Sequence, residues 1–237
     1  MRSFNRGPLE LRPVQLSAGV ARYAEGSAEV RIGHTLVRVT CSVEDRVPPH
    51  LLGKTSGWVT AEYGMLPRAT HSRSAREAAK GKQSGRTQEI QRLIGRALRA
   101  AVNLSTLGPR TFTLDCDVLE ADGGTRCASI TGAYVALGQA LKALHKQGTY
   151  QRLPALVPVA AVSVGVVGGT VVVDLDYEED STAEVDMNIV ATAEGRLVEV
   201  QGTAEHGAFA RSQLDAMVDA GLSGVARLVA LQRQALG

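Results

Sequence analysis

The sequence predicts an α+β protein made of two similar lobes, each a β-sheet backed by helices. Segments with alternating apolar residues, typical of strands, are followed by longer segments with helical periodicity. The motif Thr-Ala-Glu-Tyr-Gly at 60–64 returns as Thr-Ala-Glu-His-Gly at 203–207, and each copy follows strand-like segments and precedes an amphipathic helix. This order favours an internal duplication. We therefore expect one lobe over residues 1–150 and a second over residues 151–237.

The first lobe is expected to begin with a hairpin after an irregular start. Residues 1–27 have no regular pattern, whereas 28–32 and 35–43 are patterned as strands are. The pair Gly33-His34 between them favours a tight turn. A third strand is predicted over residues 58–63.

Positive charge is concentrated between Met65 and Arg99, where nine basic residues stand against two acidic ones, although the whole chain carries only +2. The first part, residues 68–85, has almost no large apolar side chain and predicts an exposed loop. The second part predicts an amphipathic helix with an N-cap at Thr87. Its polar face carries three arginines: Arg92, Arg96 and Arg99. A basic run is usually a solvated surface, but beside an anion site it favours contact with a nucleic-acid backbone.

A glycine pair separates a strand predicted over residues 111–119 from an apolar helix predicted over residues 130–146. Glycines let backbone N–H groups approach a ligand, and the first turn of a helix leaves N–H donors unpaired. With its threonine hydroxyl and guanidinium, the turn Gly124–Arg126 predicts a site for a phosphate-sized anion. Arg86, just before the basic helix, is a second cation for this site. The alternative is an ordinary strand-to-helix turn with a surface arginine.

The second lobe contains an acidic segment over residues 174–186, with seven Asp or Glu residues and no basic one. It overlaps the end of a predicted hairpin whose strands, 157–167 and 170–176, meet at a glycine pair. Asp180 and Asp186 can place both carboxylates on one face. Magnesium takes one or two carboxylates together with phosphate oxygens, so these two acids are candidate metal ligands. A solvated turn between strands is the alternative.

The rest of the chain predicts strands over 185–193 and 197–201 and a C-terminal helix over 209–236, interrupted near Gly221. The long apolar run 156–175 is broken by proline and glycine, so it predicts two strands and not a membrane span. The first residues do not resemble a signal peptide. Three scattered cysteines without Cys-x-x-Cys spacing predict reduced, mostly buried thiols in a cytoplasmic protein, with no zinc site.

An anion site, a metal site and a basic track together predict phosphoryl transfer at the end of a nucleic acid. Such chemistry depends mainly on positioning and charge neutralisation. Phosphate is already an anionic nucleophile at neutral pH, so no Ser-His or Cys-His pair is needed. The departing sugar oxygen needs stabilisation by a metal or a protonated carboxyl group.

Four groups of residues, in order along most of the chain, resemble the bacterial ribonuclease PH family. They are Ser84-Gly-Arg-Thr87 with Glu89–Ile94, Glu120–Arg126 with Ala128–Ala133, Asp174–Asp180 with Ala183–Asn188, and Val198–Glu205. The resemblance implies a phosphorolytic 3′→5′ exoribonuclease that trims tRNA precursors and other RNAs, such as rRNA, and releases nucleoside diphosphates. It also implies reversible nucleotide addition and a ribonuclease PH fold assembled as a homo-hexameric ring, a trimer of dimers.

Carried over by position, the resemblance assigns inorganic phosphate, the co-substrate, to Arg86, Gly124, Thr125 and Arg126. Asp180 and Asp186 are expected to be catalytic, holding Mg²⁺ or Mn²⁺ or protonating the 3′ oxygen. RNA is expected to contact five arginines: Arg68, Arg73, Arg76, Arg92 and Arg96. The start, Phe4-Asn-Arg-Gly7, departs from the Asp-Gly-Arg type of opening, which affects only expected N-terminal contacts.

Three alternatives remain at this point. The first is a non-catalytic, RNA-binding ring subunit of an exosome-type assembly, which would typically lack the acids or the phosphate arginine. The second is a hydrolytic nuclease with two metals, for which the Gly-Gly-Thr-Arg turn has no role. The third is a purely structural oligomer.

Overall fold

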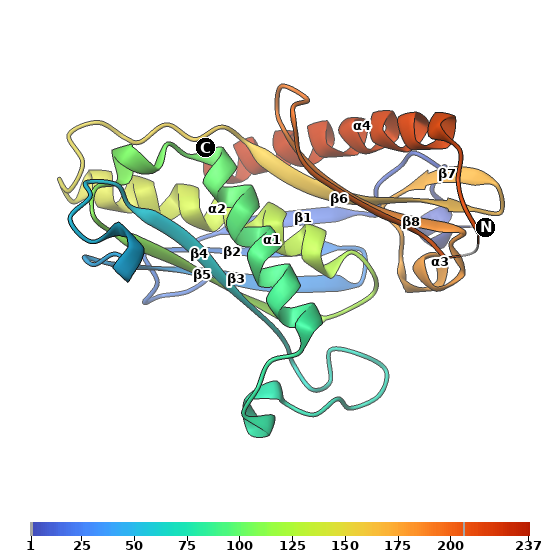
Figure 1. Ribbon diagram of the computed structural model, residues 1–237, viewed down its shortest axis with the longest axis horizontal. Helices are drawn as coiled ribbons and strands as arrows, with labels where there is room; N and C mark the ends of the chain where they lie inside the picture. The colour runs from blue at the N-terminus through green and yellow to red at the C-terminus, as the bar shows by residue number, and fades with distance from the viewer. Residues whose placement is uncertain (1, 206) are drawn as a thin grey trace.

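The computed structural model describes residues 2–205 and 207–237 and has the predicted α+β architecture. Two β-sheets lie on either side of a central helix, and buried residues of both sheets join one hydrophobic core (Figure 1). In the described residues, no helix is both long and apolar enough to cross a membrane. Short 3₁₀ turns occur at Ser3–Asn5, Pro49–Leu51, Glu77–Lys80 and Leu104–Leu107.

The first sheet has the strand order β1-β2-β3-β5-β4, and only its β4/β5 pair is parallel. The strands are β1 (Val14–Ala18), β2 (Gly26–Ile32), β3 (Thr35–Glu44), β4 (Trp58–Met65) and β5 (Thr111–Glu120). The β2–β3 hairpin turns at Gly33, which has a φ of 57°, as predicted.

The expectation that residues 1–27 are irregular was wrong, because β1 pairs with β2 along its whole length. Its apolar side chains, Val14, Leu16 and Ala18, are partly buried against the core. The strand is only five residues long and lies at the edge of the sheet, so its alternation is too short to stand out in the sequence.

Helix α1 (Gly85–Ala101) makes the crossover between the parallel strands β4 and β5. Its N-cap is Ser84, whose hydroxyl accepts the N–H of Thr87 at 3.2 Å, so the prediction of Thr87 as the cap was wrong. Thr87 lies inside the helix, where its hydroxyl donates to Glu77 at 2.9 Å. Glu77 thereby joins the exposed basic loop to the start of α1.

Helix α2 (Thr125–Lys146) lies between the two sheets and contacts β2, β3 and β6. It starts five residues earlier than the apolar pattern indicated, immediately after the glycine pair. Most of its side chains are buried, because apolar residues surround the helix instead of forming one stripe.

The second sheet is antiparallel, with the order β7-β6-β8-β9. Its strands are β6 (Val159–Val167), β7 (Thr170–Val173), β8 (Val185–Thr192) and β9 (Leu197–Ala204). The short helix α3 (Tyr177–Thr182) connects β7 and β8. Helix α4 (Arg211–Leu236) packs on β6, β7 and β8.

The predicted break at Gly221 does not occur, since α4 runs through it. A Cβ atom there would lie 2.7 Å from the Cγ1 atom of Ile189. This glycine therefore permits close packing of α4 on the second sheet.

The two copies of the repeated motif lie on β4 and at the end of β9, the edge strands of their sheets. His206 of the second copy lies outside the described residues. The surrounding topologies differ, because β4 pairs with its neighbour in parallel and β9 in antiparallel fashion. The predicted boundary between residues 150 and 151 stays a prediction.

Strand β2 and helix α2 pack closely at Gly26, so adding a single methyl group there is expected to destabilise the fold. A Cβ at Gly26 would lie 2.0 Å from the carbonyl oxygen of Ala136 and 2.6 Å from the amide nitrogen of Ala140. Gly26→Ala is expected to lower the free energy of unfolding by about 1–3 kcal/mol or more, measured by urea unfolding. Gly64→Ala is the control, since its Cβ meets nothing within 4 Å. Equal stabilities of the two variants would contradict this packing.

Candidate active site

The glycine turn, defined here as Gly123–Arg126, ends against the second sheet. Gly123 and Gly124 have φ angles of 74° and 67°, a region that favours glycine. A Cβ at Gly123 would lie 2.5 Å from the carbonyl oxygen of Leu175, so the turn needs glycine for its packing as well. The turn is thus fixed between the sheet it leaves and the acidic segment.

The first turn of α2 presents free N–H donors. Gly124 is its N-cap and provides no side-chain cap. Among the described residues, no backbone hydrogen bond has the N–H of Thr125 or Arg126 as its donor. Unpaired donors at a helix N-terminus form a site for anions.

Two further groups shape this end of α2. The hydroxyl of Tyr63, on β4, is 2.9 Å from the hydroxyl of Thr125, and both groups are buried. Burial raises the pKa of Tyr63, so its hydroxyl keeps its proton and orients Thr125. Tyr63 was missed in the sequence, although it lies in the repeated motif, which was the available signal.

Among the residues that the structure describes, the polar contacts of the Arg126 guanidinium with protein groups are long. Its guanidinium donates to Oε1 of Gln201 at 3.3 Å and lies 3.8 Å from Glu89. Gln201 in turn donates to Glu89 and Glu199 at 3.0 Å each. This network joins α1, α2 and β9 and leaves Arg126 able to bind an anion at shorter range.

The predicted carboxylates lie within electrostatic reach of the predicted arginines. Partial desolvation of the carboxylate raises the pKa of Asp180, although the residue as a whole is exposed, whereas Arg86 and Arg126 lower it. Burial raises the pKa of Asp186 to about 6, with Asp180 and Glu205 adding to the rise and the two arginines opposing it. Arg86, Arg126, Asp180 and Asp186 therefore lie within electrostatic range of one another.

Glu205, just after β9, is a third carboxylate that sequence reasoning missed. It raises the pKa of both aspartates, which places it near them. In the part of the chain that the structure describes, no group of three His, Cys, Asp or Glu side chains is arranged to hold a metal ion. The donor set that could bind a cation is thus the aspartate pair, which fits a Mg²⁺ that takes its other ligands from phosphate and water.

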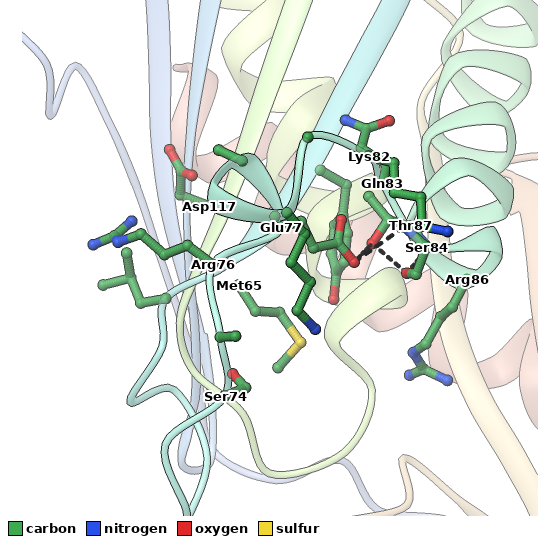
Figure 2. A pocket seen from close by; sticks show the side chains of 17 residues that line it. Met65, Ser74, Arg76, Glu77, Lys82, Gln83, Ser84, Arg86, Thr87 and Asp117 are labelled. Atoms are coloured by element: carbon green, nitrogen blue, oxygen red, sulfur yellow. Dashed lines mark hydrogen bonds between the residues drawn. The ribbon is translucent and has the colours of Figure 1, made fainter.

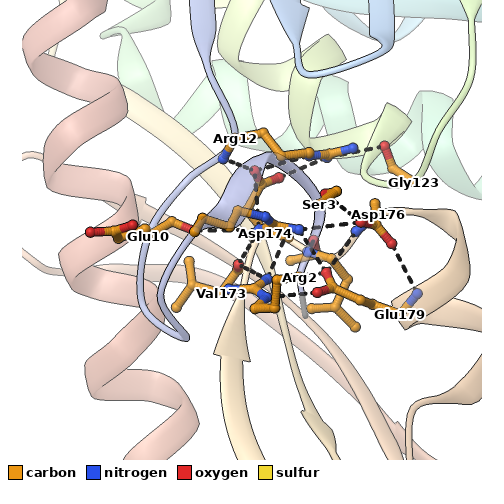
Figure 3. A network of polar contacts seen from close by, with 12 residues as sticks. Arg2, Ser3, Glu10, Arg12, Gly123, Val173, Asp174, Asp176 and Glu179 are labelled. Atoms are coloured by element: carbon orange, nitrogen blue, oxygen red, sulfur yellow. Dashed lines mark hydrogen bonds and ion pairs between the residues drawn. The ribbon is translucent and has the colours of Figure 1, made fainter.

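Two other acids of the acidic segment bind arginines near the start of the chain instead. Asp174 accepts both sides of the Arg12 guanidinium, at 3.0 and 2.7 Å. Glu179 pairs with Arg2 and Arg6 (Figure 3). Part of the segment is therefore bound to the N-terminus, apart from the two predicted catalytic acids.

The basic loop projects from the body of the first sheet, with Arg68, Arg73 and Arg76 exposed (Figure 1). A hollow of about 730 Å³ lies between this loop and the start of α1, and Arg76 and Arg86 both line it (Figure 2). Arg68 and Arg73 are not among its lining residues.

The arginines on α1 are further along the helix. Arg92 and Arg96 line a separate hollow of about 280 Å³ between α1 and β9, and Arg96 is ion-paired with Glu199. Arg99 does not share their surface: its guanidinium lies 4.6 Å from the centroid of the Trp58 ring and donates to the carbonyl oxygen of Val59. The prediction that Arg92, Arg96 and Arg99 share one face of α1 is therefore correct for Arg92 and Arg96 and wrong for Arg99.

Thiol chemistry has no place in the site. Cys127, beside Arg126, is buried, and its thiol donates to Oδ1 of Asn188 at 3.2 Å. Burial raises its pKa to about 12. A protonated thiol is a poor nucleophile, so Cys127 acts as a packing residue.

Two family models match the chain in order. The 3′ exoribonuclease family, domain 1, matches residues 10–142, and domain 2 of the same family matches residues 158–224. The chain therefore belongs to the 3′ exoribonuclease family, and its two sheets correspond to the ribonuclease PH fold.

Solved structures with the same fold include a rice protein and chains of two archaeal exosomes. Rrp46 from rice (Oryza sativa) is 19% identical, with 100% of both chains covered and a TM-score of 0.78. A chain of the Archaeoglobus fulgidus exosome with RNA bound to its active site is 22% identical, covering 96% of this chain and 91% of that one, with a TM-score of 0.78. An archaeal exosome core gives 22% identity, 96% and 89% coverage and a TM-score of 0.75. At these identities the likeness shows the fold alone.

The raised pKa of Asp186 predicts a pH-dependent stability. Its native pKa of about 6 exceeds the roughly 3.9 of an unfolded aspartate, so the native state holds the extra proton between these values. Its contribution to stability is therefore lost as pH rises through this window. Without divalent cations, Asp186→Asn should raise the free energy of unfolding at pH 7.5 by on the order of 1–2 kcal/mol more than at pH 4.

Urea unfolding at both pH values measures this difference. Asp219→Asn, an exposed change on α4, is the matched control and should have the same effect at both. A pH-independent effect of Asp186→Asn would contradict the burial of this carboxyl group.

Proposed function

We propose that this protein is a phosphate-dependent 3′→5′ exoribonuclease. The observation that carries the proposal is the open N-terminus of α2, which with Arg86 and Arg126 forms an anion site within electrostatic reach of Asp180 and Asp186. A nuclease that uses water as its nucleophile needs no binding site for inorganic phosphate beside its acids. The family to which the chain belongs acts on RNA 3′ ends, which supports the same substrate class.

In this reaction, inorganic phosphate binds to the N–H groups of Thr125 and Arg126 and to the guanidinium groups of Arg86 and Arg126. One phosphate oxygen attacks the phosphorus of the last phosphodiester, and the bond from that phosphorus to the 3′ oxygen breaks. The products are a nucleoside diphosphate and an RNA one nucleotide shorter, and the reverse reaction adds a nucleotide.

The departing 3′ oxygen must gain a proton. Asp186, with its pKa of about 6, retains a protonated fraction near neutral pH and is the group suited to supply it. Asp180 and Asp186 are also the residues that would hold Mg²⁺ or Mn²⁺, which would neutralise charge on the phosphates. The two roles for Asp186 exclude each other at any one moment, since a metal ligand must be deprotonated.

We propose tRNA precursors and other RNAs, such as rRNA, as substrates, in the cytoplasm. We also propose a homo-hexameric ring built as a trimer of dimers. The ring assembly is supported by the shared fold with exosome subunits. Exposed loop arginines Arg68, Arg73 and Arg76, together with Arg92 and Arg96, are proposed to contact the RNA backbone.

A second candidate is a non-catalytic RNA-binding subunit of an exosome-type ring. The similarity of fold to chains of two archaeal exosomes favours it. The presence of Arg86, Arg126 and both aspartates in one site favours the enzyme.

One assay separates these candidates. The protein is incubated with a 3′-extended tRNA and Mg²⁺, with and without phosphate, and the released nucleotides are identified. Nucleoside diphosphates formed only with phosphate are expected. Arg126→Ala should raise the phosphate concentration for half-maximal rate by about 10- to 100-fold, because a charge-assisted hydrogen bond contributes about 1.5–3 kcal/mol.

Arg46→Ala, an exposed change away from α2, is the control for that variant. Nucleoside monophosphates formed without phosphate would instead make the protein a hydrolase. RNA binding with no released nucleotide would favour the non-catalytic ring subunit.

The role of the basic loop predicts a change in salt dependence. Replacing Arg68, Arg73 and Arg76 by alanine should flatten the slope of log affinity against log salt concentration by about 2, since each contact with single-stranded RNA contributes roughly 0.7. Filter binding between 50 and about 300 mM salt measures the slope.

A variant with the same loss of charge elsewhere is the control: Arg22, Arg46 and Arg211, all exposed and outside the loop, replaced by alanine. If both triple variants behave alike, the loop is only a solvated surface.

A further inference from the structure

The N-terminal segment, residues 2–12, contacts the acidic segment immediately beside Asp180. Nε of Arg2 donates to Oε1 of Glu179 at 2.6 Å, and Nη2 of Arg6 donates to Oε2 of the same carboxylate at 2.7 Å. Figure 3 shows Arg2 beside Glu179 in this network. Glu179 is the chain neighbour of Asp180.

These contacts are shielded from water. The side chains of Arg2, Arg6 and Glu179 are 13%, 3% and 12% exposed. Buried charges are costly unless they are paired and hydrogen-bonded, so ion pairs of this kind have well-defined geometry. The carboxylate of Glu179 also accepts the N–H of Asp176 at 3.1 Å, which closes a capping box at the start of α3. Glu179 is thus fixed from three directions.

Helix α3 is also held at its start, where its N-cap Asp176 accepts the hydroxyl of Ser3 at 2.6 Å and the N–H of Tyr177 donates to Asp122 at 3.3 Å, but its body has little apolar anchoring. It is six residues long and none of its side chains is buried. A helix this short is not stable by itself. Buried Leu175 and Ala183 anchor the chain on either side of it, but they leave its rotation about its own axis to polar contacts.

The same segment also contacts the glycine turn. Arg12, 2% exposed, binds Asp174 through two hydrogen bonds and donates to the carbonyl oxygens of Asp122 and Gly123. The N-terminal segment therefore touches both halves of the proposed active site without contributing a group to it.

We propose that Arg2 and Arg6 are positioning residues that hold Glu179 and thereby direct the carboxylate of Asp180 toward the reacting phosphates. The inference rests on the proposed function and extends it to the start of the chain. Displacement of a reacting group by about 1 Å costs up to 100-fold in rate, so a small rotation of α3 is enough to matter.

Arg2 is the residue to change, because Arg6 is more deeply buried and its loss would leave acids unpaired. Arg2→Gln should lower kcat about tenfold, because Asp180 loses its fixed direction. The KM for phosphate should stay within about twofold of its original value, because the side chains and N–H groups proposed to bind phosphate lie on α1 and α2. Arg2→Lys, which keeps the charge near Glu179, should recover part of kcat.

Arg227→Gln is the matched control. Arg227, on α4, donates to the carbonyl oxygen of Leu9 at 3.2 Å, so its loss loosens the same N-terminal segment without touching α3. It should leave kcat unchanged. Arg2 also donates to the carbonyl oxygens of Gly7, Pro8 and Val173, but these contacts do not reach α3. In the Glu179→Gln background, Arg2→Gln should therefore have no further effect on kcat if the positioning acts through the Arg2–Glu179 contact.

A second measurement does not depend on activity. The N–H of Asp180 donates to the carbonyl oxygen of Asp176 at 2.9 Å, and its hydrogen exchange reports the opening of α3. Arg2→Gln should accelerate this exchange at least tenfold, whereas Arg227→Gln should not.

The outcomes separate the two hypotheses. Unchanged kcat in Arg2→Gln, with or without faster exchange, overturns the positioning role, as does an equal loss in Arg227→Gln. A wild-type protein that releases no nucleoside diphosphate overturns the proposed function. In that case the exchange rates alone decide whether Arg2 holds α3.

Discussion

Burial of one helix between two sheets is the constraint on which the rest of the structure depends. Helix α2 is apolar around most of its circumference, so water is excluded from it only when both sheets cover it. The strand that feeds it, β5, ends at the glycine turn, and this turn must then lie where the two sheets meet. The electropositive end of α2 is consequently placed beside the acidic segment of the second sheet.

This placement explains why basic and acidic side chains lie near one another at the candidate active site. The arginines come from α1 and α2, and the aspartates come from α3 and β8. Burial by itself disfavours the ionised aspartates, and the nearby guanidinium groups oppose that effect only in part. Asp186 is therefore held in an unfavourable charge state near neutral pH, which is the usual condition of a functional carboxyl group. The ionised form of Asp186 lowers the local stability, and binding of a proton or a cation to this carboxylate offsets that loss.

The sequence predicted the elements whose signals are local. Alternating strands, the Gly33 hairpin, the helix of the basic segment and the turn at Gly123–Arg126 are all set by neighbours within a few residues, and the structure confirms them. Asp180 and Asp186 lie within electrostatic range of Arg86 and Arg126, and their assignment as site residues stays a prediction. Local pattern failed where long-range packing decides. In the sequence Gly221 indicates a break in the helix. In the structure it lets α4 pack closely against Ile189.

The division of the acidic segment could not have been predicted from spacing. Asp174 and Glu179 look like Asp180 in the sequence, yet they pair with arginines more than 160 positions away. The opening Phe4-Asn-Arg-Gly7 seemed unrelated to chemistry, and its Arg6 nevertheless lies against Glu179. Tyr63 and Glu205 were missed for the same reason, since each reaches the site from an edge strand that folding brings beside it.

The three cysteines give the first sheet and its helix an internal reporter of opening. Cys41, Cys116 and Cys127 lie on β3, β5 and α2, each is at most 3% exposed, and burial raises the pKa of every one. Alkylating reagents attack thiolates, so the closed molecule offers them neither access nor a reactive form. The labelling rate of these thiols therefore reports the opening of this sheet without an engineered probe. It equals the opening rate when labelling outpaces reclosing, and it is proportional to the open population when reclosing is faster.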